Sequence, residues 1–242
     1  MSTKPSSRSV ELAKALEQGE ISLQGQFLLG SNYTFLVSVK HADQEFRAVY
    51  KPVRGEQPLW DFPPASLAGR EVAAYLVSEA LGLHFVPLTV LRDGPYGPGS
   101  LQQYIEYNRN YHYFNLTPAD RLRLLPVALF DLLINNADRK GSHVLFQKRT
   151  RRLFAIDHGL CFHAEDKLRT VIWDFAGEPF PAELLTTLRS IQTDRAKLIT
   201  GLGEYLLPVE VAALGARLEA MLADPVHPYP SADRRAFPYP PL

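Results

Sequence analysis

The chain has 242 residues, equal numbers of basic and acidic side chains (26 of each) and a single cysteine, Cys161. Its zero net charge gives no general attraction to phosphate polymers, so we expect no nucleic-acid partner. One cysteine excludes an internal disulfide framework and a cysteine-rich zinc site. The sequence has neither a long apolar run nor an apolar leader, so we expect a cytoplasmic protein without integral membrane association.

Strands are predicted for most of the first half of the chain. The polar residues 1–8 are expected to be disordered, and Ser9 can cap the helix that follows them. Gly30-Ser31-Asn32 has the composition of a hairpin turn between two β-rich runs. Hydrophobic periodicity and turn residues predict a helix over 9–18, strands over 21–30, 33–40 and 45–52, a helix over 66–81, and strands over 86–94 and 99–107.

Helices are predicted for most of the second half. The sequence Thr117-Pro118-Ala119-Asp120 is a capped helix start with proline at the first helical position. From Pro225 onward the chain contains six prolines, which exclude a regular helix and favour an extended arm on the surface. Between these two features the patterns predict a helix from 117 to about 135, a hairpin over 144–147 and 152–157, and helices near 181–192 and 208–222.

This order of elements predicts an α+β protein with two lobes and a cleft between them. The N-lobe is expected over 9–107, with five strands and one inserted helix, and the mostly helical C-lobe over 108–224. A proline-rich C-terminal tail over 225–242 completes the predicted organisation.

Four charged residues follow one another in an order that suits phosphoryl transfer from a nucleotide. Lys51 lies on the third predicted strand and Glu71 on the next helix, so the lysine could neutralise phosphates while the glutamate holds it in place. Asp138, in NNADRKGSHVLF, could orient an acceptor hydroxyl, and Asp157, in FAIDHGLCF, could hold a metal on the phosphates. Protein kinases place a metal-binding side chain five residues after the catalytic aspartate, and His143 occupies that position.

Each of these residues also has a purely structural interpretation. Lys51 could be a solvated edge lysine, Glu71 could face solvent, and the two aspartates could be ordinary turn residues. His143 could be a metal ligand or a packed residue beside the site. The joint occurrence of Asn-Asn-Ala-Asp-Arg, a hairpin and Ile-Asp-His-Gly favours the functional interpretation.

The segments DRKGSH (138–143) and IDHG (156–159) resemble the catalytic loop and metal motif of atypical kinases of the phosphatidylinositol 3-/4-kinase-like and HipA-like branch. The phrases AVYKP, REVAAYLVSEALG, NNADRKG and KLRTVIWDF resemble an uncharacterised bacterial family labelled phosphatidylinositol kinase-like, over roughly residues 20–200. The resemblance implies a two-lobed protein-kinase-like fold, with ATP as the nucleotide and Mg²⁺ or Mn²⁺ as the metal.

The resemblance also assigns roles to individual residues. It implies a phosphate-contacting lysine, its helix partner, a catalytic aspartate and a metal-binding aspartate at Lys51, Glu71, Asp138 and Asp157. Two positions of the catalytic loop depart from the family pattern. Lys140 stands where these kinases often have histidine, and His143 stands where they have asparagine.

Two further parts of the nucleotide site follow from the resemblance. The hairpin turn is shorter than a glycine-rich loop, so Ser31 and Asn32, with nearby backbone amides, would cover the phosphates. Gln103 and Ile105 lie where kinases place the hinge that pairs with adenine, and the backbone of Ile105 could serve there. A plain strand end is the alternative interpretation of these two residues.

The sequence therefore favours an ATP-dependent phosphotransferase that acts on a hydroxyl of an unknown protein or small molecule. A nucleotide-binding pseudokinase without phosphoryl transfer is the first alternative, because the loop lacks its asparagine and the phosphate turn is short. A protein-interaction domain that uses the WDFPP insertion (60–64) and the proline-rich tail is the second. The acceptor is not fixed by the fold family, because one fold supports many substrates.

Overall fold

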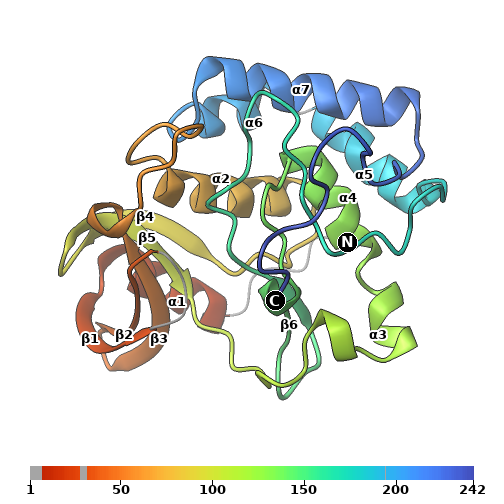
Figure 1. The fold of residues 1–242 in the computed structure, drawn as a ribbon. Helices are drawn as coiled ribbons and strands as arrows, with labels where there is room; N and C mark the ends of the chain where they lie inside the picture. The colour runs from red at the N-terminus through yellow and green to blue at the C-terminus, as the bar shows by residue number, and fades with distance from the viewer. Residues whose placement is uncertain (1–6, 28–31, 194) are drawn as a thin grey trace. The chain divides into compact units, whose positions relative to one another are not determined.

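The computed structural model describes residues 7–27, 32–193 and 195–242, and Figure 1 shows the chain as a ribbon. The chain divides into two compact units, one formed by residues up to Val72 together with Pro87–Tyr104, and the other by Ala73–Val86 together with Ile105–Leu242. Of the segment predicted to be disordered, the described residues Ser7 and Arg8 already belong to helix α1 (Ser7–Gln18).

The first unit is built on an antiparallel sheet of five strands in the order β1-β2-β3-β5-β4. Apolar residues alternate along β2 because side chains at every second position share one face of a strand. Phe35, Val37 and Val39 form one such row and are buried together with Ala15 and Leu16 of α1. The strands are β1 (Glu20–Phe27), β2 (Thr34–His41), β3 (Gln44–Pro52), β4 (Thr89–Gly94) and β5 (Gly97–Gln103).

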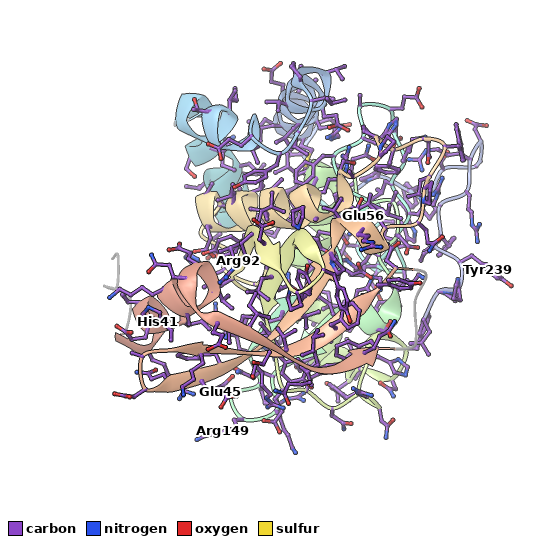
Figure 2. The ribbon with its side chains drawn as sticks, turned by 90° about the vertical axis from the view of Figure 1, so that its left-hand side faces the viewer. His41, Glu45, Glu56, Arg92, Arg149 and Tyr239 are labelled. Carbon is purple, nitrogen blue, oxygen red and sulfur yellow. The ribbon has the colours of Figure 1, made fainter. Side chains whose placement is uncertain are left out.

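Helix α2 (Leu67–Ala80) begins in the first unit and continues into the second. Its N-terminus is capped from a distance, since the Glu56 carboxylate accepts hydrogen bonds from the amides of Leu67 (3.2 Å) and Ala68 (2.9 Å). The C-terminal end of α1 is also bound by a distant side chain, since Arg92 donates a hydrogen bond to the carbonyl of Leu16 at 3.1 Å. Figure 2 labels both Glu56 and Arg92.

The second unit is mostly helical. It contains α3 (Pro118–Leu122), α4 (Leu125–Ile134), α5 (Ala182–Thr193), α6 (Arg195–Leu202) and α7 (Pro208–Ala223), with a hairpin of β6 (Val144–Phe146) and β7 (Leu153–Ala155). Helix α7 packs on α4 and α5. Leu133, Leu188, Leu214 and Leu218 are buried in the core that these helices share.

Three predicted elements differ from the structure. The strand predicted over 86–94 begins only at Thr89. The helix predicted over 117–135 is broken into α3 and α4, because Pro126 has no N–H to donate to the carbonyl of Leu122. The strand predicted over 99–107 ends at Gln103. Beyond it, Ile105 packs against the β6–β7 hairpin and Tyr107 forms a bridge with Gln147.

The last features of the fold concern the proline-rich segment after α7 and the lengths of the helices. After α7 the proline-rich segment pairs with the loop that precedes α5, through a bridge between Pro179 and Val226. Among the helices in the described part of the chain, none is both long enough and apolar enough to cross a membrane.

Candidate functional site

In the first unit, Lys51 and Glu71 form an ion pair between the lysine Nζ and the glutamate Oε1. Strand β3 places Lys51 opposite Ser100 of β5, and α2 presents Glu71. Glu71 is only 2% exposed, so its carboxylate requires a cationic partner. The pair expected from the sequence is therefore present, and the solvent-facing interpretation of Glu71 does not hold. The contact of Lys51 with a nucleotide stays a prediction.

The structure describes three of the four residues that the sequence predicts to cover the phosphates or contact adenine. Ser31 lies outside the described residues. The Oδ1 of Asn32 accepts the Gln57 amide at 2.7 Å, which ties the start of β2 to the segment after β3. Gln103 ends β5, and its amide donates to the carbonyl of Leu88 at 2.8 Å. Ile105 is buried against Leu145 and Phe154 in the second unit, and its role toward adenine stays a prediction.

In the second unit, the loop that carries Asp138 starts where α4 ends. Asn135 adopts the left-handed conformation (φ 54°) that commonly terminates a helix, and its side chain donates to the carbonyls of His163 (2.9 Å) and Glu165 (2.6 Å). The Oδ1 of Asn136 then accepts the Asp138 amide at 3.0 Å, as in an Asx turn. The two asparagines of NNADRKG therefore shape the backbone that presents Asp138.

Asp138 has an unusual electrostatic environment. Burial raises the pKa of its carboxyl, and the charge of Lys140, at 3.3 Å, opposes that rise. The nearby Asp157 raises the pKa further and Arg169 lowers it, with a net value of about 6. A carboxylate with a pKa near 6 is ionised at neutral pH and more basic than an ordinary aspartate.

The side chains of His143 and Asp157 are in contact with each other. His143 Nε2 lies 3.2 Å from Asp157 Oδ2, and His143 Nδ1 faces the Lys140 amide at 3.3 Å. Because Nδ1 accepts that amide hydrogen, the neutral ring carries its proton on Nε2 and donates it to Asp157. Asp157 follows β7 in a left-handed conformation (φ 63°), and its side chain is 48% exposed. The carboxylate is therefore oriented by His143 and remains accessible.

Beneath these residues lies a buried network that the sequence interpretation missed. Arg139 is fully buried and binds both oxygens of Asp131 on α4, with Nε–Oδ2 at 2.8 Å and Nη2–Oδ1 at 2.9 Å. It also donates to the carbonyl of Ile156 at 2.7 Å and contacts His158 Nε2 at 2.8 Å. Although burial alone would lower the pKa of Arg139, the charge of Asp131 raises it. Arg139 thus joins the backbone before Asp157 to the loop of Asp138.

One sequence signal could have revealed this network. Asp131 lies in the middle of the apolar helix LPVALFDLLI, where a charged side chain must find a buried partner. Arg123 and Arg139 are equally near to Asp131 along the chain, so the sequence signals a buried partner without choosing between them.

The donor atoms of this unit fit a hard divalent cation. Mg²⁺ is usually bound by one or two carboxylates together with phosphate oxygens and water, and Asp157 offers one accessible carboxylate. Over the described residues there is no cluster of three or more histidine, cysteine, aspartate or glutamate side chains that could hold a metal by itself. The residues therefore suit a metal that the nucleotide phosphates help to bind, rather than a dedicated protein cage.

Comparison with known proteins gives the following findings. No protein-family model matches the chain. Protein Rv2133c of Mycobacterium tuberculosis is 38% identical, and the alignment covers 93% of each chain. The Helicobacter pylori proinflammatory kinase CtkA superposes with a TM-score of 0.54 at 13% identity, covering 86% of this chain and 93% of that one. The structure of hydra Fam20 with sugar gives a TM-score of 0.53 at 16% identity and covers 91% and 89%, respectively.

The structural likeness confirms the α+β, kinase-like fold that the sequence predicts. At these low identities it shows the fold and not the reaction. The sequence likeness is much closer and extends over almost the whole of both proteins. The chain belongs to the family of the Mycobacterium tuberculosis protein Rv2133c, and its fold is kinase-like.

Proposed function

We propose that this protein is an ATP-dependent phosphotransferase of the atypical, phosphatidylinositol 3-/4-kinase-like kind, with a hydroxyl of a protein or small molecule as the acceptor. The observation that carries the proposal is the loop of Asp138 and Lys140. A carboxylate with a pKa of about 6 lies 3.3 Å from a lysine Nζ, and the charge of Asp157 acts on it. Such a group can accept the hydroxyl proton while the lysine offsets charge on the transferred phosphoryl group.

The remaining residues support binding of the nucleotide. Lys51, held by Glu71, would contact phosphates, as this partly buried ion pair fixes the position of its ammonium group. Asp157 would hold Mg²⁺ or Mn²⁺, and His143 lies beside it as a second candidate ligand. A bound metal would supply charge neutralisation on the phosphates. Ser31 and Asn32 would cover the phosphates, and Gln103 and Ile105 would contact adenine.

One observation favours a second candidate, a nucleotide-binding pseudokinase. Both ring nitrogens of His143 are engaged, Nδ1 by the Lys140 amide and Nε2 by Asp157. To bind a metal through Nε2, the ring would have to move its proton to Nδ1 and give up the bond from the amide. A metal site weakened in this way would bind nucleotide without efficient transfer.

Substitution of Asp138 separates the two functions. In a catalyst, Asp138→Asn should lower the rate of ADP formation by about 10²- to 10⁴-fold while nucleotide affinity changes little. The rate is measured with ATP and Mg²⁺ or Mn²⁺ in the presence of a panel of protein and sugar acceptors, and the affinity by calorimetry. Asp43→Asn, at an exposed turn, is the matched control. Nucleotide binding without any turnover by the unaltered chain would contradict the phosphotransferase and support the pseudokinase.

A further inference from the structure

The proline-rich segment 225–242, here called the tail segment, is fastened along the loop between β7 and α5. Near its start the His227 amide donates to the Glu178 carbonyl at 2.9 Å. In its middle the Ala236 carbonyl accepts from the Thr170 amide (3.1 Å) and from Trp173 Nε1 (3.3 Å). Repeated anchors of this kind keep an extended segment docked although it has no helix or strand of its own.

The end of the tail segment reaches the loop of Asp138. The Gly141 amide donates to the Pro241 carbonyl at 2.8 Å, and Figure 1 shows the C-terminal end of the ribbon beside β6. Gly141 is the first residue of the short 3₁₀ turn Gly141–His143, so its N–H has no partner within the turn. On another side, a Cβ at Gly141 would lie 2.8 Å from Cε2 of Phe114. The turn is thus confined by Phe114 and capped by Pro241.

This turn is connected to both carboxylates of the candidate site, Asp138 and Asp157. Lys140, which pairs with Asp138, immediately precedes it. His143 closes the turn, and its carbonyl accepts the Ile156 amide at 3.0 Å while its Nε2 contacts Asp157. A movement of the turn would therefore change the position of Lys140 and of Asp157 together.

We propose that the tail segment is a positioning element, in which the Pro241 carbonyl caps the Gly141–His143 turn and thereby fixes Lys140, His143 and Asp157. The importance of this arrangement for phosphoryl transfer rests on the proposed function. The mechanical coupling of Pro241 to the turn is a property of the fold alone. The two statements can therefore be tested separately.

Two shortened chains test this cap, and they differ from each other only in the presence of Pro240 and Pro241. A chain that ends at Pro241 keeps an oxygen acceptor for the Gly141 amide, whereas a chain that ends at Tyr239 loses it. We expect amide hydrogen exchange over 140–147 and 154–159 to be about fivefold faster in the chain ending at Tyr239, since one hydrogen bond is worth about 1 kcal/mol. The chain ending at Pro241 should exchange like the full chain.

Two controls separate loss of the cap from general loosening. The emission of Trp173, recorded in a Trp60→Phe background, should be unchanged in both shortened chains, because the contact of Trp173 with Ala236 is retained. Tyr239→Ala should also exchange normally, because the side chain is 79% exposed and points into solvent (Figure 2). Equal exchange in the full chain and in both shortened chains would overturn the proposal.

The rate of turnover is a second measurement, and it should not change if the tail segment only stabilises the fold. The chain ending at Tyr239 should lose about three- to tenfold in kcat with little change in the KM for ATP, because the cap acts on the reacting groups rather than on nucleotide binding. Faster exchange with unchanged kcat would overturn the positioning role. If the full chain has no turnover, the proposed function fails, and the exchange over 154–159 alone decides whether the tail segment positions the loop of Asp157.

Discussion

Asp138 experiences opposing electrostatic influences, and their balance sets the pH range in which it can act as a base. Burial is the largest and raises its pKa, while the charge and hydrogen bond of Lys140 lower it, to a net value of about 6. Below pH 6 the carboxyl is mostly protonated and cannot accept a proton from a hydroxyl. We therefore expect the rate of transfer to rise with pH through about 6.

Removing the charge of Lys140 should move this pH dependence. Lys140→Met removes two influences that lower the pKa of Asp138, so that pKa should rise and the acid limb of kcat/KM should shift upward with it. The position of the limb, read from a pH–rate profile, reports Asp138 even if the overall rate also falls. Lys148→Met, whose lysine pairs with Glu106, is the control. A limb that stays in place would show that another group controls it.

The hydrogen bonds of His143 lead to a prediction about metal preference. An asparagine at this position would offer a hard carbonyl oxygen, which suits Mg²⁺, whereas an imidazole nitrogen suits transition metals better. If His143 binds the metal, Mn²⁺ should support activity at least as well as Mg²⁺, and His143→Asn should shift the preference toward Mg²⁺. Activity titrations with each metal make this measurement. A strong preference for Mg²⁺ that is identical in both proteins would leave His143 with the role of orienting Asp157.

At the scale of elements, a buried ion pair connects α4 to the loops of Asp138 and Asp157. Asp131 and Arg139 are both fully buried, and Arg139 uses its remaining donors on the Ile156 carbonyl and on His158. Removal of one partner leaves an unpaired charge in the core, which costs far more than loss of an exposed pair. The network therefore holds the two loops at a fixed separation from the helix.

This difference can be measured by comparing single and double substitutions. Asp131→Leu or Arg139→Met should each lower the free energy of unfolding by about 3–5 kcal/mol, and the double variant should lose much less than the sum. Arg121→Ala, which breaks the more exposed pair with Asp174, should cost about 1 kcal/mol or less. Urea denaturation supplies all four values. Additive losses from the two buried substitutions would mean that the side chains do not act as a pair.

At the scale of the whole molecule, the proposed nucleotide and metal should stabilise the folded chain. A ligand that binds only the folded state, at 100 times its Kd, adds about 2.7 kcal/mol to the free energy of unfolding. Thermal melts with ATP and Mn²⁺ or Mg²⁺ therefore test binding even while the acceptor is unidentified.

Asp157→Asn should abolish the metal-dependent part of this stabilisation. Asparagine accepts the left-handed backbone conformation found at Asp157, so the melting temperature without ligand should change little. Asp233→Asn, at an exposed aspartate of the tail segment, is the control. The same metal-dependent rise in the variant and the unaltered chain would remove Asp157 from the metal site.

Much of the fold was predictable because its signals are local. Alternating apolar residues predicted β2 and β3, and a capped apolar run predicted the start of α3 at Thr117. Errors arose where one local signal continued across a break. The apolar pattern continues across Arg123 and Leu124 although the helix is interrupted there, and β5 ends early because Ile105 packs on the hairpin. Element type therefore follows from periodicity, whereas element ends depend on tertiary partners.

The sequence by itself determined the charged residues of the candidate site and the order in which they occur, because their motifs are short and contiguous. The Lys51–Glu71 pair followed from a strand and a helix that are neighbours along the chain. Only the tertiary structure decided that Arg139 is buried against Asp131 and that Pro241 caps Gly141. Burial and packing create such contacts between distant segments, and no periodicity in either segment encodes its partner.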